Sequence, residues 1–209
     1  MVNHLQVNES NANDVIAKEM TVQLYNIAWN DTPQISFTLQ NVTMLIIERC
    51  EKTEVIFCGS MLECLPHLHT LAISRCNELR KIIGEDAKNQ RKPFFPRLKA
   101  LVITKCSKLK CVFPISRSKM LPKLKVLVII GACMLEEVFQ GHSDQRAEIP
   151  NMKTVVFIQL PSLRQEIEFL TTKHCLVKNC PKLSMSSSLR SFQDTVKSFQ
   201  GTIHHIFYT

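Results

Sequence analysis

Several features that would point to other classes of protein are scarce or missing in this chain of 209 residues. It holds only 5 glycines and 1 tryptophan. It has no run of eighteen apolar residues, the length that predicts a membrane-spanning helix. Hydrophobic residues make up 45% and charged residues 21% of the chain, a balance that argues against disorder. The sequence therefore predicts a soluble, folded protein that is long enough to bury a sizeable core.

Signals for export and for nucleotide binding are also missing. The start, MVNHLQVNESNANDVIAKEM, has neither a cationic end nor the apolar segment of a secretory signal, so we expect a cytoplasmic protein with no membrane partner. No GxxxxGK[ST] motif occurs, and we therefore expect no bound ATP or ADP.

The cysteines do not form a pattern that predicts metal binding or catalysis. There are 9, an odd number that fits poorly with a closed disulfide framework. Cys106 and Cys111, like Cys175 and Cys180, are too far apart for the close CxxC pair of a zinc site. No pair of acidic side chains recurs with the spacing of a general acid and base. We expect no catalytic residue, metal or cofactor, and predict that the protein is not an enzyme.

What the chain does contain is an internal repeat. The stretch LPHLHTLAISRCNELRKII, residues 65–83, follows the pattern LxxLxxLxIxxCxxLxxI, and residues 98–113 and 124–139 repeat it. Fainter copies place Cys50, Leu160 and Cys180 at the cysteine position of the pattern, and Ala132 takes that position in one clear copy. A period of 20 to 30 residues is the signature of a solenoid in which stacked copies share one core.

Each copy contains a short alternation of apolar and other residues, such as HTLAIS and KALVIT. This period of two predicts a strand whose inward residues are Leu71 and Ile73 in one copy. The cysteine that follows is expected to turn the chain, with its thiol buried and able to reach a backbone carbonyl of the adjacent turn. The sequence thus predicts a loose leader over residues 1–19, a repeat domain over 20–183 and a tail over 184–209. In the tail, Leu189, Phe192, Val196 and Phe199 recur at helical spacing, so a capping helix or a partner-binding helix is expected.

The repeats resemble the irregular leucine-rich repeats of plant coiled-coil-type nucleotide-binding leucine-rich-repeat disease-resistance proteins. The resemblance rests on LHTLAISRCNELRKII, LKALVITKCSKLKCVFP, LKVLVIIGACMLEEVF and VKNCPKL. It implies an α/β leucine-rich-repeat solenoid of six to seven repeats, a curved horseshoe with short parallel strands on its concave face and irregular convex loops. It also implies a non-catalytic module of plant innate immunity that binds a pathogen effector, a guarded host protein or the nucleotide-binding module of a receptor.

In such a horseshoe, the residues between the inward Leu and Ile face the concave surface. The predicted partner-binding residues are Ile46, Arg49, Ala72, Arg75, Val102, Lys105, Val128, Val156 and Leu176. Six of them form an apolar column, and exposed apolar patches often mark interaction sites. The alternative is that flanking side chains cover the column.

The charge distribution leaves two further hypotheses open. Residues 87–135 carry twelve Lys or Arg and no Asp or Glu, a block that could bind the phosphates of nucleic acid. Many of these residues, such as Lys99, Lys108 and Lys110, occupy outward positions of a repeat, where a solvated face is the simpler explanation. The last hypothesis is a decayed receptor fragment without independent function.

Overall fold

The chain forms a solenoid of stacked strands. The computed structural model describes residues 4–9, 20–25, 39–57, 65–84, 95–114, 121–140, 151–164, 166–167 and 172–185. Within these residues every regular element is a strand, and no helix is long and apolar enough to cross a membrane. The strands are β1 (His4–Glu9), β2 (Met20–Tyr25), β3 (Met44–Glu48), β4 (Val55–Phe57), β5 (Thr70–Ser74), β6 (Lys81–Ile83), β7 (Ala100–Thr104), β8 (Cys111–Pro114), β9 (Val126–Ile130), β10 (Glu137–Gln140), β11 (Thr154–Ile158), β12 (Glu166–Ile167), β13 (His174–Lys178) and β14 (Ser184–Met185).

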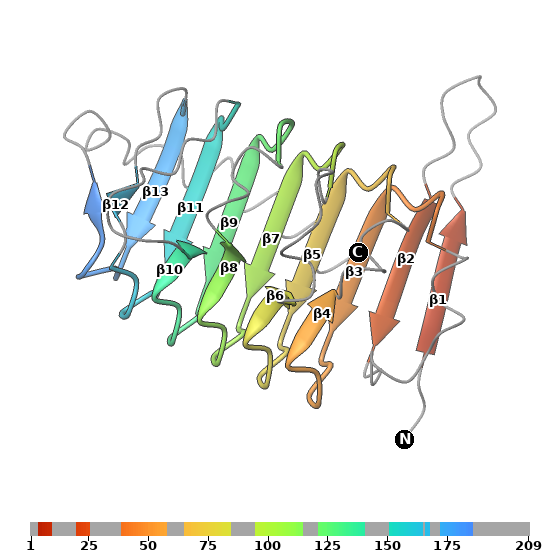
Figure 1. Ribbon diagram of the computed structural model, residues 1–209, viewed down its shortest axis with the longest axis horizontal. Coiled ribbons are helices and arrows are strands. Elements are labelled where there is room, and N and C mark those ends of the chain that lie inside the picture. Colours follow the sequence, from red (N-terminus) through yellow and green to blue (C-terminus); the bar gives the residue numbers. More distant parts are fainter. Residues whose placement is uncertain are drawn as a thin grey trace.

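The main sheet takes one strand from each copy of the repeat. Its order is β1-β2-β3-β5-β7-β9-β11-β13, so the strands lie side by side in chain order (Figure 1). All neighbours from β2 to β13 are parallel and pair residue for residue, whereas β1 pairs with β2 in the antiparallel direction. This pairing confirms the predicted leucine-rich-repeat solenoid.

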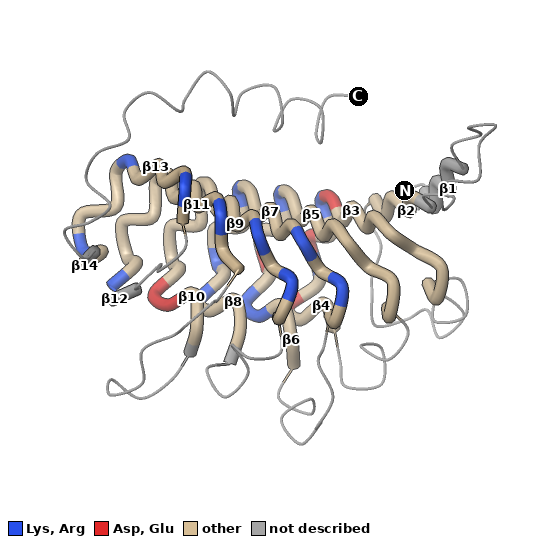
Figure 2. Tube along the Cα trace, turned by 90° about the horizontal axis from the view of Figure 1, so that it is seen from above, with Lys and Arg blue, Asp and Glu red and all other residues tan. Residues whose placement is uncertain are grey.

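A second, narrower sheet forms the opposite wall. It has the order β10-β8-β6-β4, and the tube view shows these strands in a row facing the main sheet (Figure 2). Each of its strands lies at the end of a copy and contributes apolar residues, such as Ile56 and Phe57 in β4. Parallel pairing between copies satisfies backbone groups that would otherwise lack partners. This part of the convex side is therefore more regular than the loops that the sequence predicts.

The core lies between the two sheets. Leucine, isoleucine and valine side chains of the main sheet meet the buried phenylalanines, where Phe57 and Phe95 pack edge to face with ring centroids 5.3 Å apart. Phe113 and Phe139 stack at 6.0 Å. The predicted inward residues Leu71 and Ile73 are fully buried. At about 1.5–3 kcal/mol for each buried side chain, contacts between neighbouring copies are the main source of stability.

The repeated cysteine position is part of this core, as predicted. Cys50, Cys76 and Cys106 are buried, and so are Ala132 and Leu160 in the copies that lack the cysteine. The thiol of Cys76 donates to the carbonyl of Ser74 at 3.5 Å, and that of Cys106 to Thr104 at 3.5 Å. The acceptor thus lies two residues back in the same copy, not in the adjacent turn. The Cys180 thiol also reaches a neighbouring copy, at the carbonyl of Phe157.

The chain turns at the residue before the cysteine position. This residue has a positive φ in six copies, near 55° at Arg75 and 68° at Gly131. The left-handed conformation directs its N–H to the next copy, as where Arg75 donates to the carbonyl of Thr104 at 2.9 Å. A non-glycine residue in this region costs about 1–2 kcal/mol, so the repeated turn is held by the bonds between copies. The sequence predicts a turn at the cysteine itself, one residue later than the structure places it.

The predicted domain boundaries stay predictions. β1 lies in the segment predicted as a leader, and β14, which pairs with β12, lies just inside the predicted tail. The predicted tail helix, with Leu189, Phe192, Val196 and Phe199, lies outside the described residues.

Candidate functional site

The predicted apolar column is a continuous cluster on the face of the main sheet that points away from the core. Residue-for-residue pairing brings the middle residue of each strand next to its counterpart in the neighbouring strand. We call this set the outer column: Ile46, Ala72, Val102, Val128, Val156 and Leu176. It forms an apolar cluster separate from the main core.

The centre of the outer column is buried. The exposed fraction is 0% for Ala72 and 1% for each of Val102, Val128 and Val156, whereas Ile46 and Leu176 at the two ends are half-buried. The column is thus contiguous, as its register predicts, but its central side chains are not an open patch. A role in binding a partner stays a prediction.

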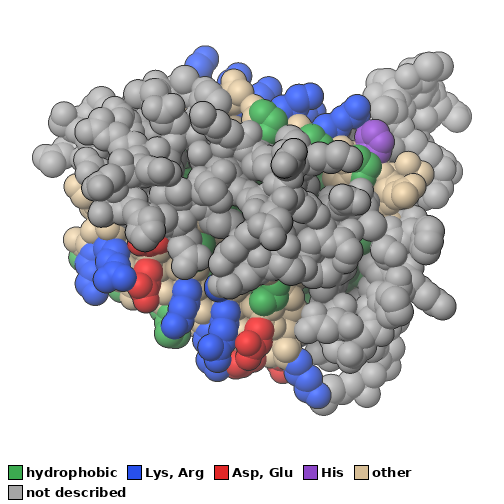
Figure 3. Space-filling view, in the orientation of Figure 1, with side chains coloured by type: hydrophobic (Ala, Val, Ile, Leu, Met, Phe, Trp, Pro, Cys, Tyr) green, Lys and Arg blue, Asp and Glu red, His purple; other side chains and the backbone are tan. Residues whose placement is uncertain are grey.

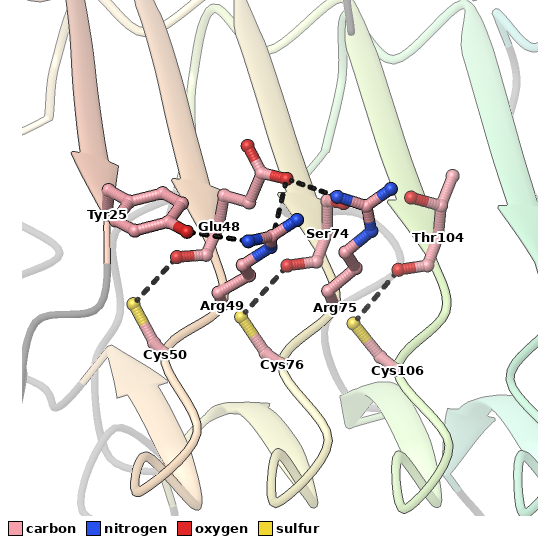
Figure 4. Close-up of polar contacts among 9 residues, drawn as sticks. All are labelled: Tyr25, Glu48, Arg49, Cys50, Ser74, Arg75, Cys76, Thr104 and Cys106. Carbon is pink, nitrogen blue, oxygen red and sulfur yellow. Dashed lines mark hydrogen bonds and ion pairs between the residues drawn. The ribbon is translucent and has the colours of Figure 1, made fainter.

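Two of the three predicted basic residues belong to a polar network across β2, β3 and β5 (Figure 4). Arg49 donates to the hydroxyl of Tyr25 at 2.7 Å, and its guanidinium carbon lies 5.6 Å from the centroid of that ring. Arg75 donates to Glu48 Oε1 at 3.2 Å, and the same oxygen lies 3.9 Å from Nε of Arg49. The side chains of Arg49 and Arg75 are 46% and 37% exposed, so solvent screens these charges and their main effect is on orientation.

Lys105, the third predicted basic residue, stands in the same row one copy further along. It is exposed, and its side chain has no hydrogen bond or ion pair with the other described residues. Arg49, Arg75 and Lys105 directly follow β3, β5 and β7 and form one row, which we call the basic row; Arg49 and Lys105 are exposed and Arg75 is half-buried. Sequence reasoning missed the anchoring role of Tyr25 and Glu48, because their contacts cross between copies.

A second line of basic residues, of which the sequence analysis named only Lys99, lies where the strands begin. Lys99, Lys125, Lys153 and Lys173 each precede a strand and are exposed; we call them the lysine line. Their backbones are bonded in series, since the N–H of Lys125 donates to the carbonyl of Lys99 at 2.8 Å and the next two steps repeat this geometry. Basic side chains accordingly follow the upper edge of the molecule (Figure 3). Aligning one more position of each copy in the sequence would have found them.

The turns that follow strands of the main sheet carry charges of both signs, and these charges are paired. Lys108 contacts Glu78 at 2.7 Å, and Arg164 contacts Glu136 at 2.6 Å, in each case across neighbouring copies. By contrast, no ion pair involves the lysine line within the described residues. Lys108 is therefore a weaker candidate for binding a polyanion than the sequence suggested.

The buried thiols of Cys76 and Cys175 do not have the character of nucleophiles. A hydrogen bond with Cys106, together with burial, raises the pKa of Cys76 to about 12, and burial raises the pKa of Cys175 to about 11. Both stay protonated near neutral pH, and the thiolate is the reactive form. In the part of the chain that the structure describes, no three His, Cys, Asp or Glu side chains come together to hold a metal ion.

Comparison with known families gives one result. A family model described as "Plant disease resistance protein RPS2-like, leucine-rich repeats" matches residues 6–77 and 77–192. No curated protein and no solved structure matches the chain.

Proposed function

Because the chain belongs to the leucine-rich repeats of plant RPS2-like disease resistance proteins, we propose that it recognises a protein partner through the outer face of its main sheet. The repeats of this family are generally non-catalytic interaction modules of plant defence. The partner would be a pathogen effector, a guarded host protein or the nucleotide-binding module of a receptor, met in the cytoplasm.

The register of the main sheet is the observation that carries this proposal. Because seven strands pair residue for residue, side chains from copies far apart in the sequence form one continuous surface. The basic row follows the ends of three of these strands, and the network with Tyr25 and Glu48 fixes two of its three side chains. Pre-positioned arginines are frequent anchors of protein interfaces because little rotamer entropy is lost when they bind.

Charge reversal in the basic row tests the proposal. Arg75→Glu plus Lys105→Glu should reduce recovery of defence-related partners from infected plant tissue by at least tenfold, since two anchoring charges become repulsive. The matched control is Lys52→Glu plus Lys110→Glu, which makes the same change of charge at exposed positions away from the sheet face. Equal recovery of a named partner by both variants would contradict the proposed face.

The lysine line favours a second candidate, the binding of nucleic acid. Neighbouring strands lie about 4.8 Å apart, so the four ammonium groups form a closely spaced row of positive charge. Such rows bind phosphate backbones by releasing counterions. This candidate does not need the basic row or the outer column.

Fluorescence anisotropy with duplex and single-stranded probes separates the two candidates. If the lysine line binds phosphates, Lys125→Gln plus Lys153→Gln should lower the slope of log affinity against log salt by about 1.5. Lys52→Gln plus Lys110→Gln serves as the control. Flat anisotropy at low salt would rule out this function and would leave the protein-interaction proposal untouched.

A further inference from the structure

The ends of β5 and β7 bring together four side chains that carry hydrogen-bond donors. Each of these strands finishes on a hydroxyl residue that is followed at once by a basic residue. Ser74 and Thr104 are register partners, so they stand one strand spacing apart, which is about 4.8 Å. We call this set the donor cluster: Ser74, Arg75, Thr104 and Lys105.

The donor cluster lies on the outer face of the main sheet. Ser74 and Thr104 each come two residues after a member of the outer column, and side chains two apart in a strand share a face. The guanidinium of Arg75 is on the same side, because it contacts Glu48, the register partner of Ser74. Figure 4 shows the side chains of Ser74, Arg75 and Thr104 projecting from the strand ends.

Most donors of this cluster have no acceptor among the described residues. The two hydroxyls make no hydrogen bond with a described residue, and the ammonium of Lys105 makes no ion pair with one. In Arg75, a single nitrogen, Nη1, contacts Glu48 at 3.2 Å. A guanidinium carries five N–H donors, so several of them remain for a further acceptor.

The same positions in the neighbouring copies do not continue the cluster. On one side stands the acidic Glu48, and on the other side the apolar Ile130, which is the register partner of Thr104. Gly131 follows and has no side chain, and a Cβ added there would meet Lys105 no closer than 3.8 Å. The donor cluster is therefore confined to two strands, unlike the lysine line, and the copy beside it leaves room for a small apolar group.

The donor types of the cluster match a phosphate group. Arginine, lysine, serine and threonine side chains are the usual partners of phosphate oxygens. A phosphate monoester carries a charge of about −1.5 to −2 near neutral pH and has three acceptor oxygens, so it balances two cations and still has an oxygen for the hydroxyls. A carboxylate has one charge and two oxygens, and Glu48 already supplies one to Arg75. The cluster therefore fits a phosphate monoester better than a carboxylate.

We propose that the donor cluster binds a phosphate monoester on a side chain of the protein partner. The two cations neutralise the phosphate, and the two hydroxyls fix the direction of its oxygens. The carbon part of the ester extends toward Ile130 and Gly131. That the phosphate belongs to a protein rests on the proposed function, whereas the site itself does not. Recognition of the partner then depends on its phosphorylation.

Titration of the full-length chain with phenyl phosphate tests the site without any partner. Amide NMR signals, recorded at constant ionic strength, should shift in a saturable way at the residues of the donor cluster. Binding should be at least fivefold tighter than that of benzoate, which offers a carboxylate on the same ring. Ser74→Ala plus Thr104→Val removes both hydroxyls without changing the charge, and should weaken the binding of phenyl phosphate at least fivefold.

Two further variants make the result specific. Thr70→Val plus Ser162→Ala makes the same chemical changes outside the cluster and should leave the affinity unchanged. Glu48→Gln removes the carboxylate that engages Arg75 and repels an anion, so phenyl phosphate should bind at least threefold more tightly. The amide spectrum reports the fold of every variant. If the double hydroxyl variant unfolds, Thr104→Val alone takes its place, with binding at least twofold weaker.

Unchanged affinity in the hydroxyl variant would overturn the proposal, since diffuse positive charge would then explain the binding. Absence of saturable shifts at the donor cluster would overturn it as well, and so would equal binding of benzoate. Inorganic phosphate that binds as tightly as phenyl phosphate would overturn the assignment to an ester.

Phosphatase treatment of the plant extract tests the source of the phosphate. Recovery of the partner by the wild-type chain should fall at least fivefold, and unchanged recovery would overturn the assignment to a phosphorylated side chain. The two proposals fail separately. Absence of phenyl phosphate binding leaves recognition through the basic row standing. If phenyl phosphate binds but Arg75→Glu plus Lys105→Glu leaves partner recovery unchanged, the proposed function fails and the phosphate site stands.

Discussion

The two sides of the main sheet are both apolar and both buried at their centre, but they differ in how they are closed. On the inner side, the narrow sheet and its phenylalanines complete a core within the described residues. On the outer side, the described residues contribute only the sheet itself. Burial on the inner side therefore belongs to the fold of every copy. The outer column is a separate cluster that lies outside this core.

Neighbouring residues of β9 give the most direct test of this difference. Leu127→Ala on the inner side should lower the free energy of unfolding by about 2–5 kcal/mol, because it opens a cavity in the main core. Val128→Ala on the outer side should cost about 1.5 kcal/mol. Urea unfolding followed by circular dichroism measures both values.

A cost for Val128→Ala as large as the cost for Leu127→Ala would contradict the comparison. It would mean that the outer column supports the fold as strongly as the main core does.

A change of pH should affect the stability of the main core on the inner side through the ionisation of Cys76. The pKa of this thiol is raised to about 12 in the folded chain, from 9.0. The unfolded chain therefore releases the proton first, and stability that is complete below pH 9 is lost progressively up to pH 12. The contribution of this thiol should be about 1.4 kcal/mol smaller at pH 10 than at pH 7. Chemical unfolding of the wild type and Cys76→Ala at both pH values measures the difference, and parallel losses in the two proteins would refute this assignment.

Substitutions in the turns that end the strands of the main sheet should have the smallest effect on stability. Gly131 has a φ of 68°, and a side chain added there would meet Lys105 no closer than 3.8 Å. Space is thus available, and the cost of Gly131→Ala comes from the left-handed backbone alone, about 1 kcal/mol. The reverse change, Lys105→Gly, should cost less than Gly131→Ala or stabilise the protein. A thermal shift assay compares the two, and a larger loss for Lys105→Gly would contradict the backbone explanation.

Much of the inner side could be predicted from the sequence. The alternation in TLAIS assigns Leu71 and Ile73 to one face by parity alone, and the repeat places Cys76 three residues after Ile73 in the same core. Only the pattern of one copy is needed for this. The same parity assigned Ala72 and Val102 correctly to the outer face.

Other features depend on contacts that no single copy contains. Parity places Val102 on the outer face but leaves open whether that face is exposed or covered, so both alternatives stood at the level of the sequence. The left-handed turn at Arg75 or Lys105 has no sequence signal, because these side chains give no preference for a positive φ, unlike Gly131. The bond from Arg75 to Glu48 joins residues 27 positions apart and becomes visible only once the strands are in register.

The residue-for-residue register also bears on how such a chain changes length in evolution. Each copy bonds only to the copies beside it, and the cysteine position is followed three residues later by a buried leucine, Leu79 in one copy and Leu109 in the next. Loss of residues 77–106 would join Cys76 directly to Ser107 and put Leu109 in the place of Leu79. β5 would then meet β9 with the same pairing. Recombination between copies can thus add or remove one position of the outer column at a time without disturbing the rest of the protein.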